Sequence, residues 1–414
     1  MARGDISRTA IYFVETGKSK PSLETLRLIA ERTGRPIEFF LADPAGSAET
    51  SAMSVIELER IIATGDNTGA VEFGERMLEK RLDPETEAMV KAHLAMAFLR
   101  LAQPVRARRA ATSARSYFES RGDLLMVAEC LGHEASAAHL LQEPVAVAIG
   151  EAALSTLRTL KVVPPTTESR LLFVLATAHA VQHNWQQAVD FYQQAIDAGD
   201  QVRDLRRLSL SYSGISLAYQ ELGQFSQAAR FSRQALAIHE TLNDTMSLAR
   251  SENNLGLLLA RMGDFESSRE HLDRALRLHE EVGLEIGMGD AMLSMSELLF
   301  AQSKLDEAER LARKALALST RLSEFPAIAD AHLWLGRIAD ARGRHDIVDS
   351  EFAAAIAALE GIGSREPLRR VQVAYADILE QRGDLAGANR HLKRALATPG
   401  SSGPAALSSR SAIA

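Results

Sequence analysis

Little in this sequence points to a secreted or membrane protein, because the residues and runs typical of those classes are missing. The 414 residues include a single cysteine, Cys130, so no disulfide can form within the chain and nothing indicates an oxidising compartment. No uncharged apolar run approaches the roughly 18–20 residues of a membrane-spanning helix. The first residues, MARGDISRTAIYF, lack the apolar stretch of a signal peptide. We therefore predict a cytoplasmic protein with no membrane partner.

The chain also lacks a strong excess of charge and any catalytic motif. The 47 basic and 54 acidic residues give a net charge of −7, which excludes a bulk attraction to nucleic acid. Residues 1–41 differ, since seven basic and five acidic side chains give them +2 and leave −9 for the remainder. Neither a Walker loop nor a G-x-S-x-G motif is present. We predict no enzyme activity, no catalytic residue and no cofactor.

The eleven histidines do not form a recognisable metal-binding pattern. His179 and His183 are four residues apart and would share one face of a helix, but no cysteine or third ligand stands nearby at zinc spacing. His239 and His279 are 40 positions apart, as duplication of a unit would produce. Cys130 lies in an apolar helical stretch and is predicted to be a small buried side chain. We predict no bound metal.

What the chain does contain is a repeated pair of small residues seven positions apart. Nine copies can be laid along the sequence, and five of the intervals between them are 40 positions long. The first marker falls at Ala70, Ala107, Ala146, Ala188, Ala228, Ser268, Ala308, Val348 and Ala388, and the second at Met77, Ala114, Ala153, Ala195, Ala235, Ala275, Ala315, Ala355 and Ala395. A fixed period in this range indicates a solenoid, in which each unit buries its apolar face only against its neighbours.

The clearest unit, residues 248–283, shows how one repeat is expected to fold. Leu255 and Leu259 give its first half an apolar face at helical spacing, and Gly263 ends that helix. Gly256 stands where two helices would cross and where a side chain would hold them apart. Each repeat is therefore predicted to be a helical hairpin.

These residues resemble the tetratricopeptide repeat (TPR) family, with a glycine at the turn, an aromatic residue or leucine two positions later, and two alanines seven apart in the second helix. The resemblance implies an all-α fold, a TPR-type α-solenoid forming a right-handed superhelix of about nine hairpins over residues 53–397, with the 40-residue period from 169 onward. Residues 42–52, which are small, polar and contain proline and glycine, are predicted to be a linker. Residues 398–414 are predicted to be a disordered tail.

Residues 1–41 resemble the second half of an Xre or lambda-repressor type helix-turn-helix domain. The matching residues are Ser7, Ile11, Val14, Glu15, Gly17, Pro21, Ser22, Leu23, Leu26, Ala30, Gly34, Pro36 and Phe40. In that family the helix that would follow Ser7 lies in the major groove of DNA. The resemblance implies that Arg8, Thr9 and Tyr12 approach base edges. It also implies that Lys18 and Lys20 meet phosphates.

This helix-turn-helix segment is shorter than the family's domain, because the sequence starts where the third helix of that domain would begin. Two explanations remain open at this point. The coding sequence begins further upstream and supplies the missing helices, or the segment is a relic that no longer binds DNA.

The solenoid's binding surface is expected to be the face lined by the first helix of each hairpin. Positions counted back from the first marker place Arg250, Asn253, Arg261, Gln220, Glu297 and Arg337 on a groove for a peptide or protein ligand. A carboxamide such as that of Asn253 carries a donor and an acceptor, so it can pair with a peptide unit whatever its side chain. The alternative is that these residues are simply solvated.

Together the two resemblances predict a bacterial transcriptional regulator. Its helix-turn-helix would bind DNA, while the TPR domain would bind a peptide or protein ligand and mediate oligomerisation, with a homodimer as the expected form. The alternative, of another class, is a TPR scaffold that holds partner proteins together without DNA-binding activity.

Overall fold

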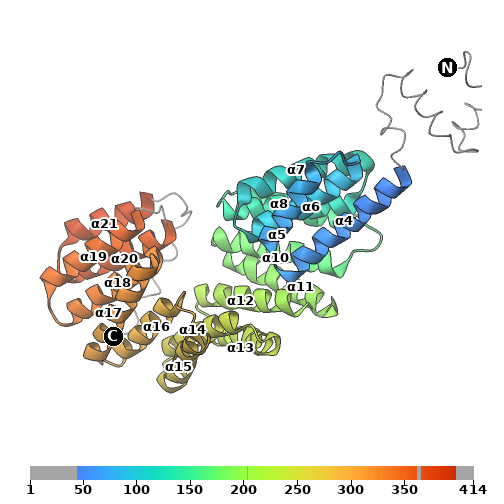
Figure 1. Cartoon of the computed structure of the whole chain (residues 1–414). Helices are drawn as coiled ribbons and strands as arrows, with labels where there is room; N and C mark the ends of the chain where they lie inside the picture. Colours follow the sequence, from blue (N-terminus) through green and yellow to red (C-terminus); the bar gives the residue numbers. More distant parts are fainter. Residues whose placement is uncertain (1–43, 203, 361–364, 398–414) are drawn as a thin grey trace, which may run out of the picture. The chain divides into compact units, whose positions relative to one another are not determined.

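The computed structural model describes residues 44–202, 204–360 and 365–397, and within them the chain forms 18 helices and no strand (Figure 1). The helices fall into two compact units that divide between Leu141 and Gln142. In the first unit lie α4 (Pro44–Thr64), α5 (Asn67–Leu78), α6 (Pro84–Arg100), α7 (Pro104–Arg121) and α8 (Leu124–Leu140). The second contains α9 (Ala146–Arg158), α10 (Pro165–Val181), α11 (Trp185–Val202), α12 (Leu205–Glu221), α13 (Phe225–Leu242), α14 (Thr245–Arg261), α15 (Phe265–Val282), α16 (Met288–Ala301), α17 (Leu305–Leu322), α18 (Phe325–Ala341), α19 (His345–Glu360), α20 (Arg365–Gln381) and α21 (Leu385–Ala397).

The predicted all-α solenoid of helical hairpins is confirmed. The helices alternate along the chain, and we call the even-numbered ones helices A and the odd-numbered ones helices B. All eighteen marker side chains are buried, with Met77 and Ala388 the most exposed at 5% each. The small residues therefore lie where helices pack against one another, as the repeat pattern requires.

The linker predicted from the sequence needs correction. Residues 44–52, predicted as a linker, belong to α4. Small and polar composition does not prevent helix formation here, because Pro44 occupies the first helical position, where a proline is tolerated, and alanine and glutamate favour the helix that follows. The helix-turn-helix segment and the tail over residues 398–414 lie outside the described residues.

Gly256 allows the two helices of its hairpin to approach closely. A Cβ atom at this position would come within 2.7 Å of Leu272 Cγ and 3.2 Å of the Ser268 carbonyl oxygen on α15. Gly336 has the same role 80 positions later, where a Cβ would meet the Phe352 ring at 2.8 Å. The crossing point predicted at Gly256 is thus confirmed, and Gly336 allows the same close approach.

The turn inside each hairpin uses one residue in the left-handed conformation. Gly263 has φ +83°, and its counterparts Ser303 and His183 both have φ 60°. In some hairpins an aspartate after the turn caps helix B, as where Asp264 Oδ1 accepts a hydrogen bond from the Ser267 amide at 3.2 Å. The tight turn makes helices A and B antiparallel neighbours, so helix A always presents the same face.

The core is a series of small clusters rather than one centre. One cluster joins α18, α19 and α20 around Phe352 and Val371, and another in the first unit surrounds Leu58 and Leu94. Cys130 is fully buried, as predicted. In the part of the chain that the structure describes, no helix is long and apolar enough to cross a membrane.

Candidate functional site

The candidate site is a stripe of side chains along each helix A of the second unit. On α14 the stripe consists of Arg250, Asn254, Leu257 and Arg261, spaced four, three and four residues apart, so they project from one side of the helix. Equivalent stripes recur at 40-position intervals on the other helices A from α10 to α20. We call these positions the A-helix face.

Neighbouring stripes adjoin one another through residues 40 positions apart. Arg370 on α20 forms an ion pair with Asp330 on α18. The pKa of Asp377 is raised by burial and lowered in part by the nearby Arg337 guanidinium, which lies on the next stripe. The A-helix face is therefore continuous between α18 and α20.

The six predicted groove residues lie on or beside this face. Arg250 and Arg261 are exposed, whereas Gln220, Asn253, Glu297 and Arg337 are half-buried. The carboxamide oxygen of Asn253 is buried and accepts no hydrogen bond among the described residues. A buried polar atom without a partner is costly, so this oxygen favours a ligand donor.

Apolar side chains dominate the stripe on α12. Leu210 and Leu217 are exposed by 54% and 50%, although both are large aliphatic residues. On α14 the neighbouring Leu257 is half-buried. The face thus changes from apolar on α12 to basic on α14.

Carboxylates gather further along, around α16 and α18. Asp290 reaches solvent, yet the surrounding protein displaces enough water to raise the pKa of its carboxyl, and Asp330 and Glu324 raise it further by repulsion. Glu324 is held in place because its Oε1 accepts a hydrogen bond from the Gly287 amide at 3.1 Å. This region carries the opposite charge to α14.

Aromatic rings support the face between these charged regions. The Arg337 guanidinium carbon lies 5.1 Å from the centre of the Trp334 ring, which packs against Phe300 with ring centres 5.7 Å apart. Arg337 is therefore engaged within the protein. Trp334 is half-buried next to the stripe and would report on a ligand there.

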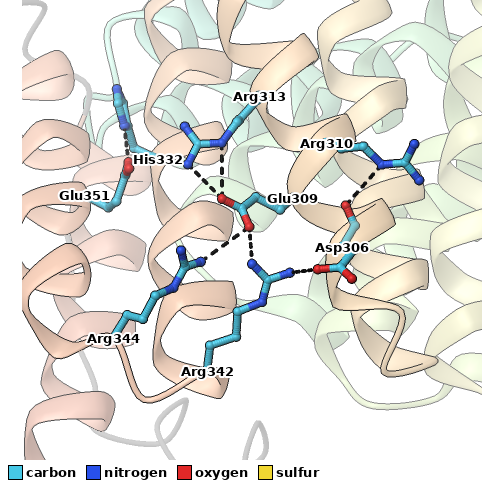
Figure 2. A network of polar contacts seen from close by, with 8 residues as sticks. All are labelled: Asp306, Glu309, Arg310, Arg313, His332, Arg342, Arg344 and Glu351. Carbon is cyan, nitrogen blue, oxygen red and sulfur yellow. Dashed lines mark hydrogen bonds and ion pairs between the residues drawn. The ribbon is translucent and has the colours of Figure 1, made fainter.

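A cluster of charged side chains around Glu309 connects helix B of one hairpin to the next hairpin. Glu309 on α17 receives three guanidinium groups, from Arg313 on the same helix and from Arg342 and Arg344 around the α18–α19 turn (Figure 2). Its carboxyl is only 16% exposed, and the hydrogen bonds from Arg313 and then Arg342 lower its pKa. The group braces the two helices B and leaves the A-helix face free.

We expect Glu309→Gln to destabilise the fold by about 1–3 kcal/mol, because the half-buried Arg342 and Arg344 and the exposed Arg313 lose their shared anion. The lowered pKa means that the wild-type advantage is complete above the ordinary value of 4.5 and disappears as the pH falls through the folded-state pKa. Urea unfolding of both proteins at neutral and acidic pH measures this. Exposed Glu307→Gln is the control, and an unchanged gap at low pH would contradict the argument.

Pairs of a half-buried histidine with a glutamate on the neighbouring helix are a feature that sequence reasoning missed. Glu252, fully buried on α14, accepts a hydrogen bond from His271 Nδ1 at 2.6 Å and forms an ion pair with Arg274 at 2.7 Å. The same slot, 19 residues apart, holds His332 and Glu351 at 2.6 Å. The repeated 19-residue offset between a helix A and a helix B position could have revealed these pairs. They hold hairpins together and lie away from the stripe.

No group of three or more His, Cys, Asp and Glu side chains is placed to hold a metal among the described residues. His179, considered above as a ligand, stacks on Phe191 with ring centres 5.2 Å apart. The stripe residues Asn254 and Leu210 were not predicted, although Leu210 stands 40 positions before Arg250 and Asn254 four positions after it, a spacing that would have identified them.

Family comparisons agree with both resemblances seen in the sequence. A family model described as helix-turn-helix matches residues 2–40, and a model described as tetratricopeptide repeat matches residues 168–241 and 247–321. The predicted combination of an Xre-type segment with TPR repeats is confirmed. No curated protein sequence matches the chain.

Several solved structures have the same fold. A Rap protein in complex with competence and sporulation factor is 13% identical, with a TM-score of 0.60, covering 84% of this chain and 97% of that one. The quorum sensor NprR from B. thuringiensis is 16% identical, with a TM-score of 0.55 and coverage of 84% and 99%. Aspartyl phosphate phosphatase F from Bacillus subtilis is 14% identical, with a TM-score of 0.58 and coverage of 84% and 93%. At these identities the likeness shows the fold.

Proposed function

We propose that this chain, which joins a helix-turn-helix segment to TPR repeats, is a cytoplasmic transcriptional regulator that binds DNA through residues 2–40 and a peptide ligand on the A-helix face. The observation that carries the proposal is the presence of both family matches in one chain. The fold likeness to a quorum sensor and to a Rap protein solved with its factor supports the sensing role. We propose binding and not catalysis.

The ligand would act by favouring one shape of the repeat stack. In a homodimer, two recognition helices must match DNA half-sites about 34 Å apart or a multiple of that distance. A ligand can change their separation only if it has different affinities for the two shapes of the protein. The proposed oligomerisation is therefore part of the mechanism.

DNA binding by the full chain is tested with genomic fragments in an electrophoretic mobility shift at two salt concentrations. We expect retained fragments whose affinity falls steeply with salt, because phosphate contacts release counterions. Lys18→Gln should reduce the salt dependence by about one phosphate contact, whereas Arg8→Ala should relax sequence preference. A chain that shifts no fragment at either salt concentration would be a TPR scaffold and would contradict the DNA-binding proposal.

Asn253→Ala should abolish peptide binding without lowering Tm, because the buried carboxamide oxygen has no partner to lose within the described protein. Binding is measured as retention of a pool of random heptapeptides on the immobilised full chain, with Trp334 fluorescence as a second readout.

Gln193→Ala is the matched control, since this exposed carboxamide lies on α11, a helix B. Its peptide retention should equal that of the unaltered chain. Equal retention by the Asn253 variant would contradict the role of Asn253.

A further inference from the structure

The α12–α14 part of the A-helix face has the chemistry of a site for an acidic peptide. We infer that the ligand is an extended peptide with two carboxylate groups flanking an apolar centre, one of them its C-terminal carboxylate. The inference rests on the peptide-binding function proposed above, and it names the class of peptide and the residues that select it.

Two arginines on α14 have no partner among the described residues. Arg250 and Arg261 are exposed, and neither makes an ion pair or a hydrogen bond with any residue that the structure describes. Arg250 nevertheless acts on a neighbouring group. Burial lowers the pKa of His239 most, and the positive charge of Arg250 lowers it further. Free guanidinium groups in a chain of net charge −7 favour an external anion.

Three other arginines on or beside the A-helix face, Arg337, Arg370 and Arg382, are engaged within the protein. Arg370 pairs with Asp330, and Arg382 pairs with Asp340 at 3.0 Å and Asp349 at 3.1 Å. The α18–α20 part of the face therefore satisfies its own charges. The α14 part of the face, by contrast, presents Arg250 and Arg261 as open donors.

The spacing of the two cations sets the length of the ligand. Eleven residues of helix separate Arg250 from Arg261, which corresponds to about 16 Å along the axis. An extended peptide advances about 3.3–3.6 Å per residue, so roughly five residues span this distance. One carboxylate at each end of such a segment would meet one guanidinium.

Apolar side chains lie between and beside the two cations. Leu257 stands between them on α14, and Leu210 and Leu217 are exposed on α12, each 40 positions before Arg250 and Leu257 respectively. Exposed leucines beside a recognition residue favour apolar ligand side chains. The carboxamide oxygen of Asn253 is buried and has no partner among the described residues, so it can accept a hydrogen bond from a main-chain amide of the same peptide.

Negative groups at the edges restrict where an acidic ligand can lie. Glu221 occupies the α12 position that corresponds to Arg261, and Asp290 occupies the α16 position that corresponds to Arg250. A carboxylate displaced from Arg261 toward α12 would be repelled by Glu221, and one displaced from Arg250 toward α16 would be repelled by Asp290. This arrangement holds each ligand carboxylate on α14.

The experiment exposes the full chain to two random heptapeptide pools, one with free C-terminal carboxylates and one amidated, and identifies the retained peptides by mass spectrometry. We expect the free-carboxylate pool to yield peptides rich in Asp or Glu and in Leu, Ile, Val or Phe. Arg250→Gln and Arg261→Gln should each weaken the best peptide at least tenfold, as expected for loss of a charge-assisted hydrogen bond. Raised salt should weaken it further.

The control is Arg277→Gln, an exposed arginine on α15 that lies on a helix B and should leave affinity unchanged. Enrichment of basic or neutral peptides, or equal affinity in the two α14 variants and the unaltered chain, would overturn this inference while leaving peptide binding intact. Retention of no peptide by the unaltered chain would overturn the proposed ligand function and this inference with it.

Discussion

Phe352→Ala is expected to destabilise the last two hairpins by about 3–5 kcal/mol, the cost typical of removing a buried aromatic ring. The ring is fully buried and stacks on Tyr375 with centres 4.7 Å apart. It also fills the space that Gly336 leaves open, where even one added carbon would lie 2.8 Å away. Truncation would leave a cavity between α18, α19 and α20 that small neighbours cannot close.

Hydrogen exchange and urea unfolding measure this effect together. In a repeat protein the loss of stability need not spread evenly along the chain, because each unit contacts only its neighbours. Amides of α18–α21 should exchange faster in the variant, while those of α4–α8 should keep their rates. Uniform acceleration along the chain would show that the protein unfolds as one unit and would contradict the local picture.

Ala275→Leu is expected to cost about 1–3 kcal/mol through overpacking. Ala275 is fully buried on α15, on the side of that helix where Gly256 allows α14 to approach. A leucine there would push the two helices apart or force its own side chain out of a favoured rotamer. The measurement is the midpoint of urea unfolding.

The matched control is Ala237→Leu, which makes the same change on the exposed side of α13. Its effect should stay within about 0.5 kcal/mol, as for most surface substitutions. Equal stability of the two variants would mean that the alanine repeat does not mark helix contacts.

Most of the fold could be predicted because the spacing of small residues within one helix determines which face of that helix is buried. Ala188 and Ala195 are seven residues apart in sequence and therefore share one face of a helix, and both are buried as that rule requires. Gly256 was predicted to lie at a crossing for the same reason. The division between Leu141 and Gln142 was not predicted, because it depends on how whole hairpins pack and not on the pattern within one.

The candidate site was only partly predictable. Counting back from the markers found Arg250 and Arg261, yet it could not show that Arg337 lies over Trp334 or that Arg370 pairs with Asp330. Those contacts depend on rotamers and on how neighbouring hairpins stack, which no single-helix pattern specifies. The prediction of a linker over residues 42–52 was wrong, since α4 begins at Pro44. The composition of this segment suits a loop and a helix equally.

Repeat units of equal length have a consequence for how such a protein can change over time. Between Ala188 and Ala388 the first marker recurs at a constant interval, so a recombination that removes or inserts one whole unit would join chemically equivalent ends. The number of stripes can therefore vary between lineages without redesign of any single hairpin.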